Sequence, residues 1–395
     1  MYTLLMVVVI FAGGGNWRAA YPLLAGLGLI VLLIAASIGW QLIVRHGFLT
    51  WRRLARSPAK AMSRGDVVGA DRAFVAAVAR ARQFSPHDHR RGIMHLELTD
   101  YLKNLGRCSE AKAFFEESVE ILGRRWQSSP VEYLIALNNQ AVYFIDIQDF
   151  AGAQRILEKV LDLTLFWSKG GIKPAAPVYT VQSIELILHL NLVVLCVRVE
   201  ELTPAADHLE EADALFGKFT KAQQRQWSDY YRGVRALLLH AQGRFTMAAN
   251  ELDMAKNPED LMCVSVRAKL NMEQRDFSQA EQLLRKCLEM EGKRGSVHRP
   301  ELRDPVMDLA ESLFGQSKYD EAFNALEEAQ AISHDFVLPA TSAWRKTLAD
   351  WLHRSQQLGR TADIASLEAD LQKMSAIPEQ AITISPKLRI RPPVS

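Results

Sequence analysis

The stretch that decides the fold is residues 137–161, LNNQAVYFIDIQDFAGAQRILEKVL, in which two mainly apolar segments flank a polar turn at Gln148 and Asp149. After the turn, apolar residues return every three or four positions, which is the spacing of one buried face of an α-helix. This face consists of Ala153, Ile156, Leu157, Val160 and Leu161. The stretch therefore predicts two amphipathic helices joined by a tight turn.

The turn block at residues 148–153 recurs along the chain. Clear copies begin at Gly65, Gly106, Gln148, Gly243, Arg275 and Ser317, and weaker copies begin at Glu200 and Gly359. The last positions of successive blocks are 41, 42, 52, 43, 32, 42 and 42 residues apart. Repeats of about this length are typical of stacked helical units. We therefore predict an all-α fold, an α-solenoid of helix hairpins that spans residues 65–376.

Small residues stand at fixed distances from the last position of most blocks. Twelve residues before it are Ala141, Ala236, Ala268 and Ala310, and seven residues after it are Ala77, Ser118, Ala212 and Ala255. A small side chain lets two helix backbones approach closely. These positions are therefore predicted to lie in buried contacts between helices.

The repeated pattern resembles the tetratricopeptide repeat (TPR) family, whose usual period is 34 residues. The 42-residue step and the block 149–157 are similar to the longer repeats of kinesin light chains, and the resemblance covers roughly residues 65–374. It implies a rod that binds proteins or peptides. Of the carboxylate clamp that many TPR proteins use, only Asn139 matches, because Leu96, Asp100 and Asn191 stand where other residue types are needed. Binding of acidic chaperone tails is therefore not expected.

The inner-facing positions of the central repeats form the candidate partner site, which would hold a protein or peptide ligand in a concave groove. The amides are expected either to hold a peptide backbone or to bridge helices within the rod. The candidate residues are Ile135, Asn138, Asn139, Val142, Asn191, Leu195, Tyr230 and Val234.

The N-terminal residues 1–44 are predicted to anchor the chain in a membrane. The 22 residues 23–44 carry no charge and would form a helix about 33 Å long, enough for a hydrocarbon core of about 30 Å. The run 2–15 is shorter, and it fits a short first span, an interfacial segment or the apolar part of a signal sequence. The fold is thus expected to begin with one or two transmembrane helices.

A basic segment, residues 45–64, follows the predicted span. Residues 1–65 hold seven Lys and Arg and no acid, so the remaining 330 residues hold 40 basic and 45 acidic residues. The excess of positive charge places the repeat domain in the cytoplasm, and the mildly acidic body excludes a nucleic-acid partner. The basic residues that flank the membrane are Arg45, Arg52, Arg53, Arg56, Lys60 and Arg64.

Sequence motifs for catalysis are absent, since no phosphate loop, dinucleotide fingerprint, zinc-protease or nucleophile-elbow pattern occurs. The cluster His87-Asp88-His89 follows Pro86, where an Asp is a natural first residue of a helix. The four cysteines are widely spaced, which favours buried thiols. We expect no enzyme activity, no cofactor and no metal.

Two segments depart from the repeat. Residues 168–177 are rich in Gly and Pro and are expected to form a loop between repeats. Residues 377–395 carry four prolines and a basic run, and are expected to form a mostly disordered tail that docks on the rod or on lipid.

These observations predict a membrane-anchored TPR scaffold or adaptor that binds protein partners at the cytoplasmic face, most readily of a bacterial inner membrane. Its layout resembles the two-span TPR membrane proteins associated with heme synthesis. It also resembles the anchored TPR protein of lipopolysaccharide assembly, but lacks the paired C-x-x-C motifs of that protein. The alternative is an import or chaperone-docking receptor of an organelle outer membrane.

Overall fold

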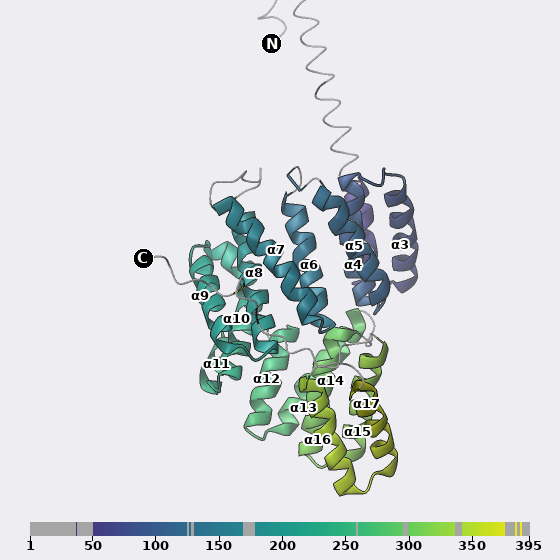
Figure 1. Ribbon diagram of the computed structural model, residues 1–395, viewed down its shortest axis with the longest axis vertical. Coiled ribbons are helices and arrows are strands. Elements are labelled where there is room, and N and C mark those ends of the chain that lie inside the picture. Colours follow the sequence, from purple (N-terminus) through teal and green to yellow (C-terminus); the bar gives the residue numbers. More distant parts are fainter. Residues whose placement is uncertain are drawn as a thin grey trace, which may run out of the picture.

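The computed structural model describes residues 50–124, 126–127, 130–168, 178–257, 260–294, 299–335 and 342–375, together with Ser37, Ile384 and Leu388. All regular secondary structure in these residues is helical, and the helices pack as successive pairs (Figure 1). The predicted all-α fold is therefore confirmed, and the pairwise packing is consistent with an α-solenoid.

The helices follow one another in pairs after a helix at residues 50–62 and its partner α3 (Val67–Arg82). The first helices of the later pairs are α4 (His89–Asn104), α6 (Pro130–Asp146), α8 (Val178–Arg198), α10 (Lys221–Ala241), α12 (Leu261–Glu273), α14 (Arg303–Gly315) and α16 (Ser342–Leu358). Their second helices are α5 (Cys108–Arg124), α7 (Phe150–Ser168), α9 (Leu202–Gly217), α11 (Phe245–Asp253), α13 (Phe277–Arg294), α15 (Tyr319–Asp335) and α17 (Thr361–Ser375). A short 3-10 helix, η1 (Pro300–Leu302), precedes α14.

The turn inside each pair has the same backbone geometry in all eight copies. The first residue of every block has a positive φ, between 59° and 76°, and these residues are Gly65, Gly106, Gln148, Glu200, Gly243, Arg275, Ser317 and Gly359. This left-handed conformation ends the first helix sharply and suits glycine best. The weaker blocks at residues 200 and 359 are thus true copies of the repeat.

The residues around each turn also behave as the repeat predicts. In the blocks that continue with Asp, this side chain caps the second helix: Asp149 Oδ1 accepts a hydrogen bond from the backbone N of Gly152 at 2.8 Å. The alanine that ends a block is fully buried in seven copies, namely Ala70, Ala111, Ala153, Ala205, Ala248, Ala280 and Ala322. The predicted contacts at Ala77, Ala141, Ala236, Ala268 and Ala310 are fully buried too, whereas Ala255 is only half-buried.

The helical array begins earlier in the sequence than the repeat pattern suggests. Residues 50–62 form a helix whose side chains Trp51, Ala55 and Met62 are buried in the core shared with the following helices. These apolar positions recur at helical spacing, but the basic residues between them obscure the pattern. At least residues 50–62 of the expected juxtamembrane segment therefore belong to the rod.

The first helices form one continuous layer, which we call the inner layer: α6, α8, α10, α12 and α14. Each of these helices contacts the next, while no contact of similar extent joins the second helices of successive pairs within the described residues. An array whose first helices touch and whose second helices are spread apart must curve toward the first helices. The curvature brings α14 beneath α4 (Figure 1).

The predicted transmembrane residues 23–44, the run 2–15 and the loop 169–177 lie outside the described residues, apart from Ser37. Within the described part, one segment, Val181–Arg198 of α8, is long and apolar enough to cross a membrane, and 61% of it is buried inside the protein. Because α8 packs against α6, α7, α9 and α10, its apolar character is explained by its central place in the rod.

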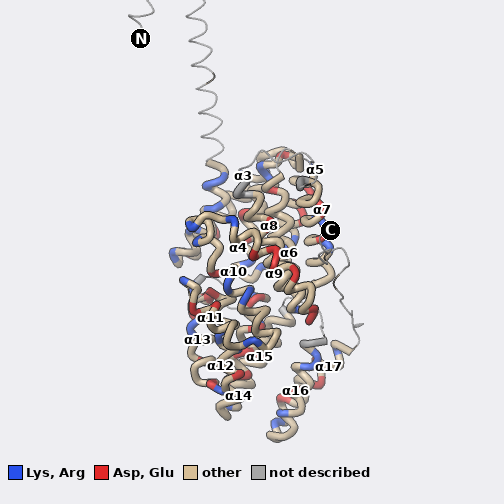
Figure 2. The backbone as a smooth tube through the Cα atoms, turned by 90° about the vertical axis from the view of Figure 1, so that its left-hand side faces the viewer, with Lys and Arg blue, Asp and Glu red and all other residues tan. Residues whose placement is uncertain are grey.

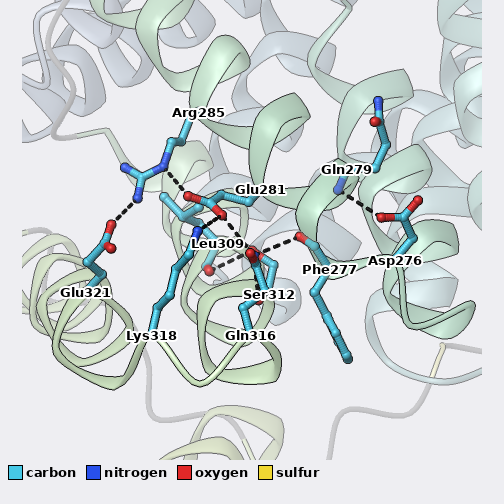
Figure 3. A network of polar contacts seen from close by, with 10 residues as sticks. All are labelled: Asp276, Phe277, Gln279, Glu281, Arg285, Leu309, Ser312, Gln316, Lys318 and Glu321. Carbon is cyan, nitrogen blue, oxygen red and sulfur yellow. Dashed lines mark hydrogen bonds and ion pairs between the residues drawn. The ribbon is translucent and has the colours of Figure 1, made fainter.

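A polar network joins α13 to the turn between α14 and α15 (Figure 3). Glu281 accepts hydrogen bonds from Arg285 Nε at 2.8 Å, Lys318 Nζ at 2.7 Å and Gln316 Nε2 at 2.8 Å. Burial by itself would raise the pKa of Glu281, but the hydrogen bonds from these three side chains lower it to about 2. The charged carboxylate thus links two successive helix pairs.

We expect Gly243→Ala to destabilise the protein by about 1–2 kcal/mol, because an alanine tolerates a φ of 72° poorly. The matched control is Gly217→Ala at the end of α9. At both positions an added Cβ would meet nothing within 4 Å, but Gly217 does not have a positive φ. The control should therefore stabilise by up to about 1 kcal/mol. Urea unfolding measures both changes, and equal effects would contradict the turn geometry.

We expect the network around Glu281 to make the protein sensitive to acid. The pKa of Glu281 is lowered in the folded state, so its contribution to stability is complete above the ordinary value of 4.5 and is lost as the pH falls toward about 2. Urea unfolding between pH 6 and pH 2.5 should show a smaller loss of stability for Glu281→Gln than for the wild type. Identical pH profiles for the two proteins would show that ionisation of Glu281 does not contribute to the pH dependence of stability.

Candidate functional site

The predicted partner residues all lie on first helices of the inner layer, and a hydrogen-bonded ladder connects three of them. Asn191 Nδ2 on α8 donates to Asn138 Oδ1 on α6 at 2.8 Å. Tyr230 OH on α10 donates to Asn191 Oδ1 at 2.6 Å. This amide ladder, Asn138–Asn191–Tyr230, crosses three successive helices. Asn138 and Asn191 are buried, and burial raises the pKa of Tyr230, so its hydroxyl stays protonated at neutral pH.

The asparagines were expected either to hold a peptide backbone or to bridge helices, and the ladder shows which role Asn191 has. Both the oxygen and the nitrogen of this amide are used inside the rod, so Asn191 bridges helices. Its partner on α6 is Asn138. Asn139 is half-buried and makes no side-chain hydrogen bond within the described part of the chain.

The other predicted residues divide into an accessible and a buried set. Ile135 is 37% exposed, Val142 is half-buried, and together with Asn139 they form one stripe of α6 at positions i, i+4 and i+7. Leu195 and Val234 are fully buried. The expectation that these two line an open groove is therefore wrong, because their side chains fill the contacts of α8 and α10 with neighbouring helices.

Charged residues on the first helices of several pairs form a second group, which the sequence did not single out. Lys103 Nζ on α4 pairs with Asp146 Oδ2 on α6 at 2.9 Å, and Lys269 Nζ on α12 pairs with Asp308 Oδ1 on α14 at 2.5 Å. Arg198 at the end of α8 pairs with Asp304 of α14. We call these six residues the charged tier. A sequence pattern could have indicated three of them, because each is a charged residue two or three positions before a turn block. These three are Lys103, Asp146 and Arg198.

The charged tier closes the curved array. The pair Arg198–Asp304 joins residues 106 positions apart, and Arg299 Nη1 donates to Asn104 Oδ1 over 195 positions at 3.4 Å. Burial by itself would lower the pKa of Lys103, but Asp146 and Glu301 raise it above its usual value. The start of α14 is therefore held electrostatically against the ends of α4 and α8.

The closure leaves some buried polar groups unsatisfied. Arg303 donates from Nη2 to Asp304 Oδ1 at 2.8 Å. Among the described residues, its Nη1 has no hydrogen-bond partner, and neither have Asp308 Oδ2 and Glu301 Oε2. Burial and the nearby charge of Arg198 lower the pKa of Arg303. Each unsatisfied buried group costs about 1–3 kcal/mol, so the closure is a contact of limited strength.

The basic residues expected to flank a membrane have two different environments. Arg52 and Arg56 bind neighbouring helices: Arg52 Nη2 lies 3.5 Å from Glu132 Oε1, and Arg56 donates to both oxygens of Glu97 at 2.8 and 2.6 Å. Arg53, Lys60 and Arg64 are exposed. Arg45 lies outside the described residues. Along the rest of the rod, basic and acidic residues are interspersed (Figure 2).

The described part of the chain holds no group of three or more His, Cys, Asp or Glu that could bind a metal ion. Asp88 caps α4 by accepting a hydrogen bond from the backbone N of Arg90, as expected for a helix start. His95 is buried against Phe114, away from that cap. All four cysteines, which are described residues, are buried, and none forms a disulfide.

No protein-family model matches the chain, and no curated protein matches it.

We expect Asn191→Ala to destabilise the protein by about 1–3 kcal/mol, because it removes two hydrogen bonds and leaves Asn138 Oδ1 and Tyr230 OH without partners. Asn139→Ala is the matched control on the neighbouring stripe and should stay within about 0.5 kcal/mol of the wild type. Chemical denaturation of the purified protein measures both. A larger effect for Asn139 than for Asn191 would mean that the ladder is wrongly assigned.

Proposed function

We propose that the protein is a membrane-anchored scaffold of the TPR type that binds protein partners at the cytoplasmic face. The observation that carries the proposal is the stripe Ile135, Asn139 and Val142 on α6. Two aliphatic side chains lie there beside an amide that makes no side-chain hydrogen bond to any residue that the structure describes. An exposed apolar residue beside an unused amide is a surface that a polypeptide can cover.

The architecture around this stripe supports the proposal. The amide ladder fixes α6, α8 and α10 relative to one another, so the stripe belongs to a rigid surface that needs little ordering when a partner binds. Side-chain amides can both donate to and accept from a peptide backbone. Repeat rods commonly offer such extended surfaces to protein partners.

The membrane anchor and the orientation of the chain rest on the sequence. The uncharged run 23–44 and the basic residues that follow it support an anchored protein with a cytoplasmic rod. Within the rod, Arg53, Lys60 and Arg64 remain exposed, and their charge is available to anionic headgroups.

A photo-crosslinking amino acid placed at Ile135 or Val142 in the native membrane should yield discrete adducts with partner proteins. Met247 on α11 is the matched control, because it is 45% exposed but belongs to a second helix. Immunoblotting and mass spectrometry identify the adducts. Adducts at Met247 with none at Ile135 or Val142 would contradict the proposed binding surface.

A further inference from the structure

The C-terminal segment carries two residues that are packed inside the rod. Ile384 is 1% exposed and Leu388 is fully buried, and both belong to the core that contains α8 and α9. The repeat helices end at Ser375, in a different apolar core. Of the two outcomes expected for residues 377–395, docking on the rod is therefore observed at these two positions.

A pair of histidines, the buried His208 and the half-buried His189, binds the backbone of this segment. His208 Nε2 on α9 lies 2.5 Å from the carbonyl oxygen of Leu388, and His208 Nδ1 lies 3.2 Å from Nδ1 of His189 on α8. A carbonyl can only accept, so Nε2 of His208 carries a proton. In the neutral ring Nδ1 then accepts from His189, and burial favours the neutral form because it lowers the pKa of both histidines.

The hydrogen bonds run in one direction, from His189 to His208 and on to Leu388. The carbonyl of Leu388 is therefore the last acceptor of this chain of hydrogen bonds, at its buried end. His208 itself is 1% exposed. The acceptor for Nε2 of His208 comes from a segment 180 positions away in the sequence. His208 is therefore placed to bind the backbone of a peptide.

This contact lies apart from the candidate partner surface. His189 and Asn191 are two residues apart on α8, which places them about 200° apart around the helix. The amide ladder and the histidine pair thus use opposite sides of the same helix. The contact goes beyond the proposed function, since it concerns another surface of the rod.

The charges of the two elements are complementary. Helix α9 holds the acidic residues Asp207, Glu210, Glu211 and Asp213 and no Lys or Arg. Around Leu388 the sequence carries Lys387, Arg389 and Arg391. Apolar anchors would fix the peptide and opposite charges would orient it.

We propose that the seam between α8 and α9 is a docking site for a basic linear peptide with two aliphatic anchors four residues apart. The chain's own C-terminal segment occupies this site through Ile384 and Leu388. Because the segment belongs to the same chain, its binding is intramolecular, and its effective concentration at the site is on the order of millimolar. A second peptide of this chemistry binds only when the tethered segment is displaced.

The test uses the full chain and a fluorescent synthetic peptide of residues 380–392. The variant Ile384→Asp with Leu388→Asp disables the tethered segment, and it should bind the peptide at least tenfold more tightly than the wild type does. Adding His208→Ala to that variant should weaken binding at least tenfold, and so should the same two Asp changes made in the peptide. Higher salt should weaken binding as well.

Two results of this titration would overturn the proposal. One is equal affinity for the wild type and the disabled variant, which would place the peptide elsewhere. The other is no binding to a disabled variant whose helical content by circular dichroism equals that of the wild type. Neither result would bear on the crosslinks at Ile135 and Val142, so the two proposals fail separately.

A second measurement covers the case in which the disabled variant does not fold. Trypsin cleaves after Lys387, next to the docked Leu388. His208→Ala alone should accelerate this cleavage at least fivefold over the wild type, because the backbone of Leu388 loses its donor. Equal cleavage rates in the two proteins would overturn the docking site.

Discussion

The left-handed residue at the start of each turn block is the constraint on which the remaining structure depends. A positive φ at this position ends one helix and aims the next one back along it, so the buried alanines of the two helices meet. Four of the eight positions are not glycine, and at these the left-handed conformation raises the free energy of the folded state. The geometry is nevertheless the same in all copies, because each hairpin can bury its apolar stripe only in this arrangement.

Repetition of this turn places the first helices side by side in the inner layer. The helices of this layer carry the stripe on α6 and one residue of the histidine pair, on α8. The amide ladder holds α6, α8 and α10 in register, while the charged tier brings the start of α14 back to the ends of α4 and α8. The accessible stripe belongs to α6, whereas the histidine pair belongs to α8 and α9. One rod therefore offers two surfaces of different chemistry, an apolar and amide-bearing one and an acidic one.

The periodic features of the fold could be predicted from the sequence, and the features that depend on curvature could not. The turn blocks, the buried alanines and the cap at Asp88 follow from local patterns. The start of the rod near Trp51 was hidden by surrounding arginines. Burial of Leu195 and Val234, the pairing of Asn138 with Asn191, and the contact of His208 with Leu388 all depend on how distant helices approach one another. No spacing in the chain encodes these distances.

The closure of the array between α8 and α14 is the most direct test of this account, because it joins residues 106 positions apart. A carbodiimide forms an amide bond only between an amine and a carboxylate in contact. In the Arg198→Lys variant we expect a crosslink from position 198 to Asp304, alongside the local crosslinks Lys103–Asp146 and Lys269–Asp308. Mass spectrometry of the digested protein detects all three. The local crosslinks without the one to Asp304 would contradict a closed array.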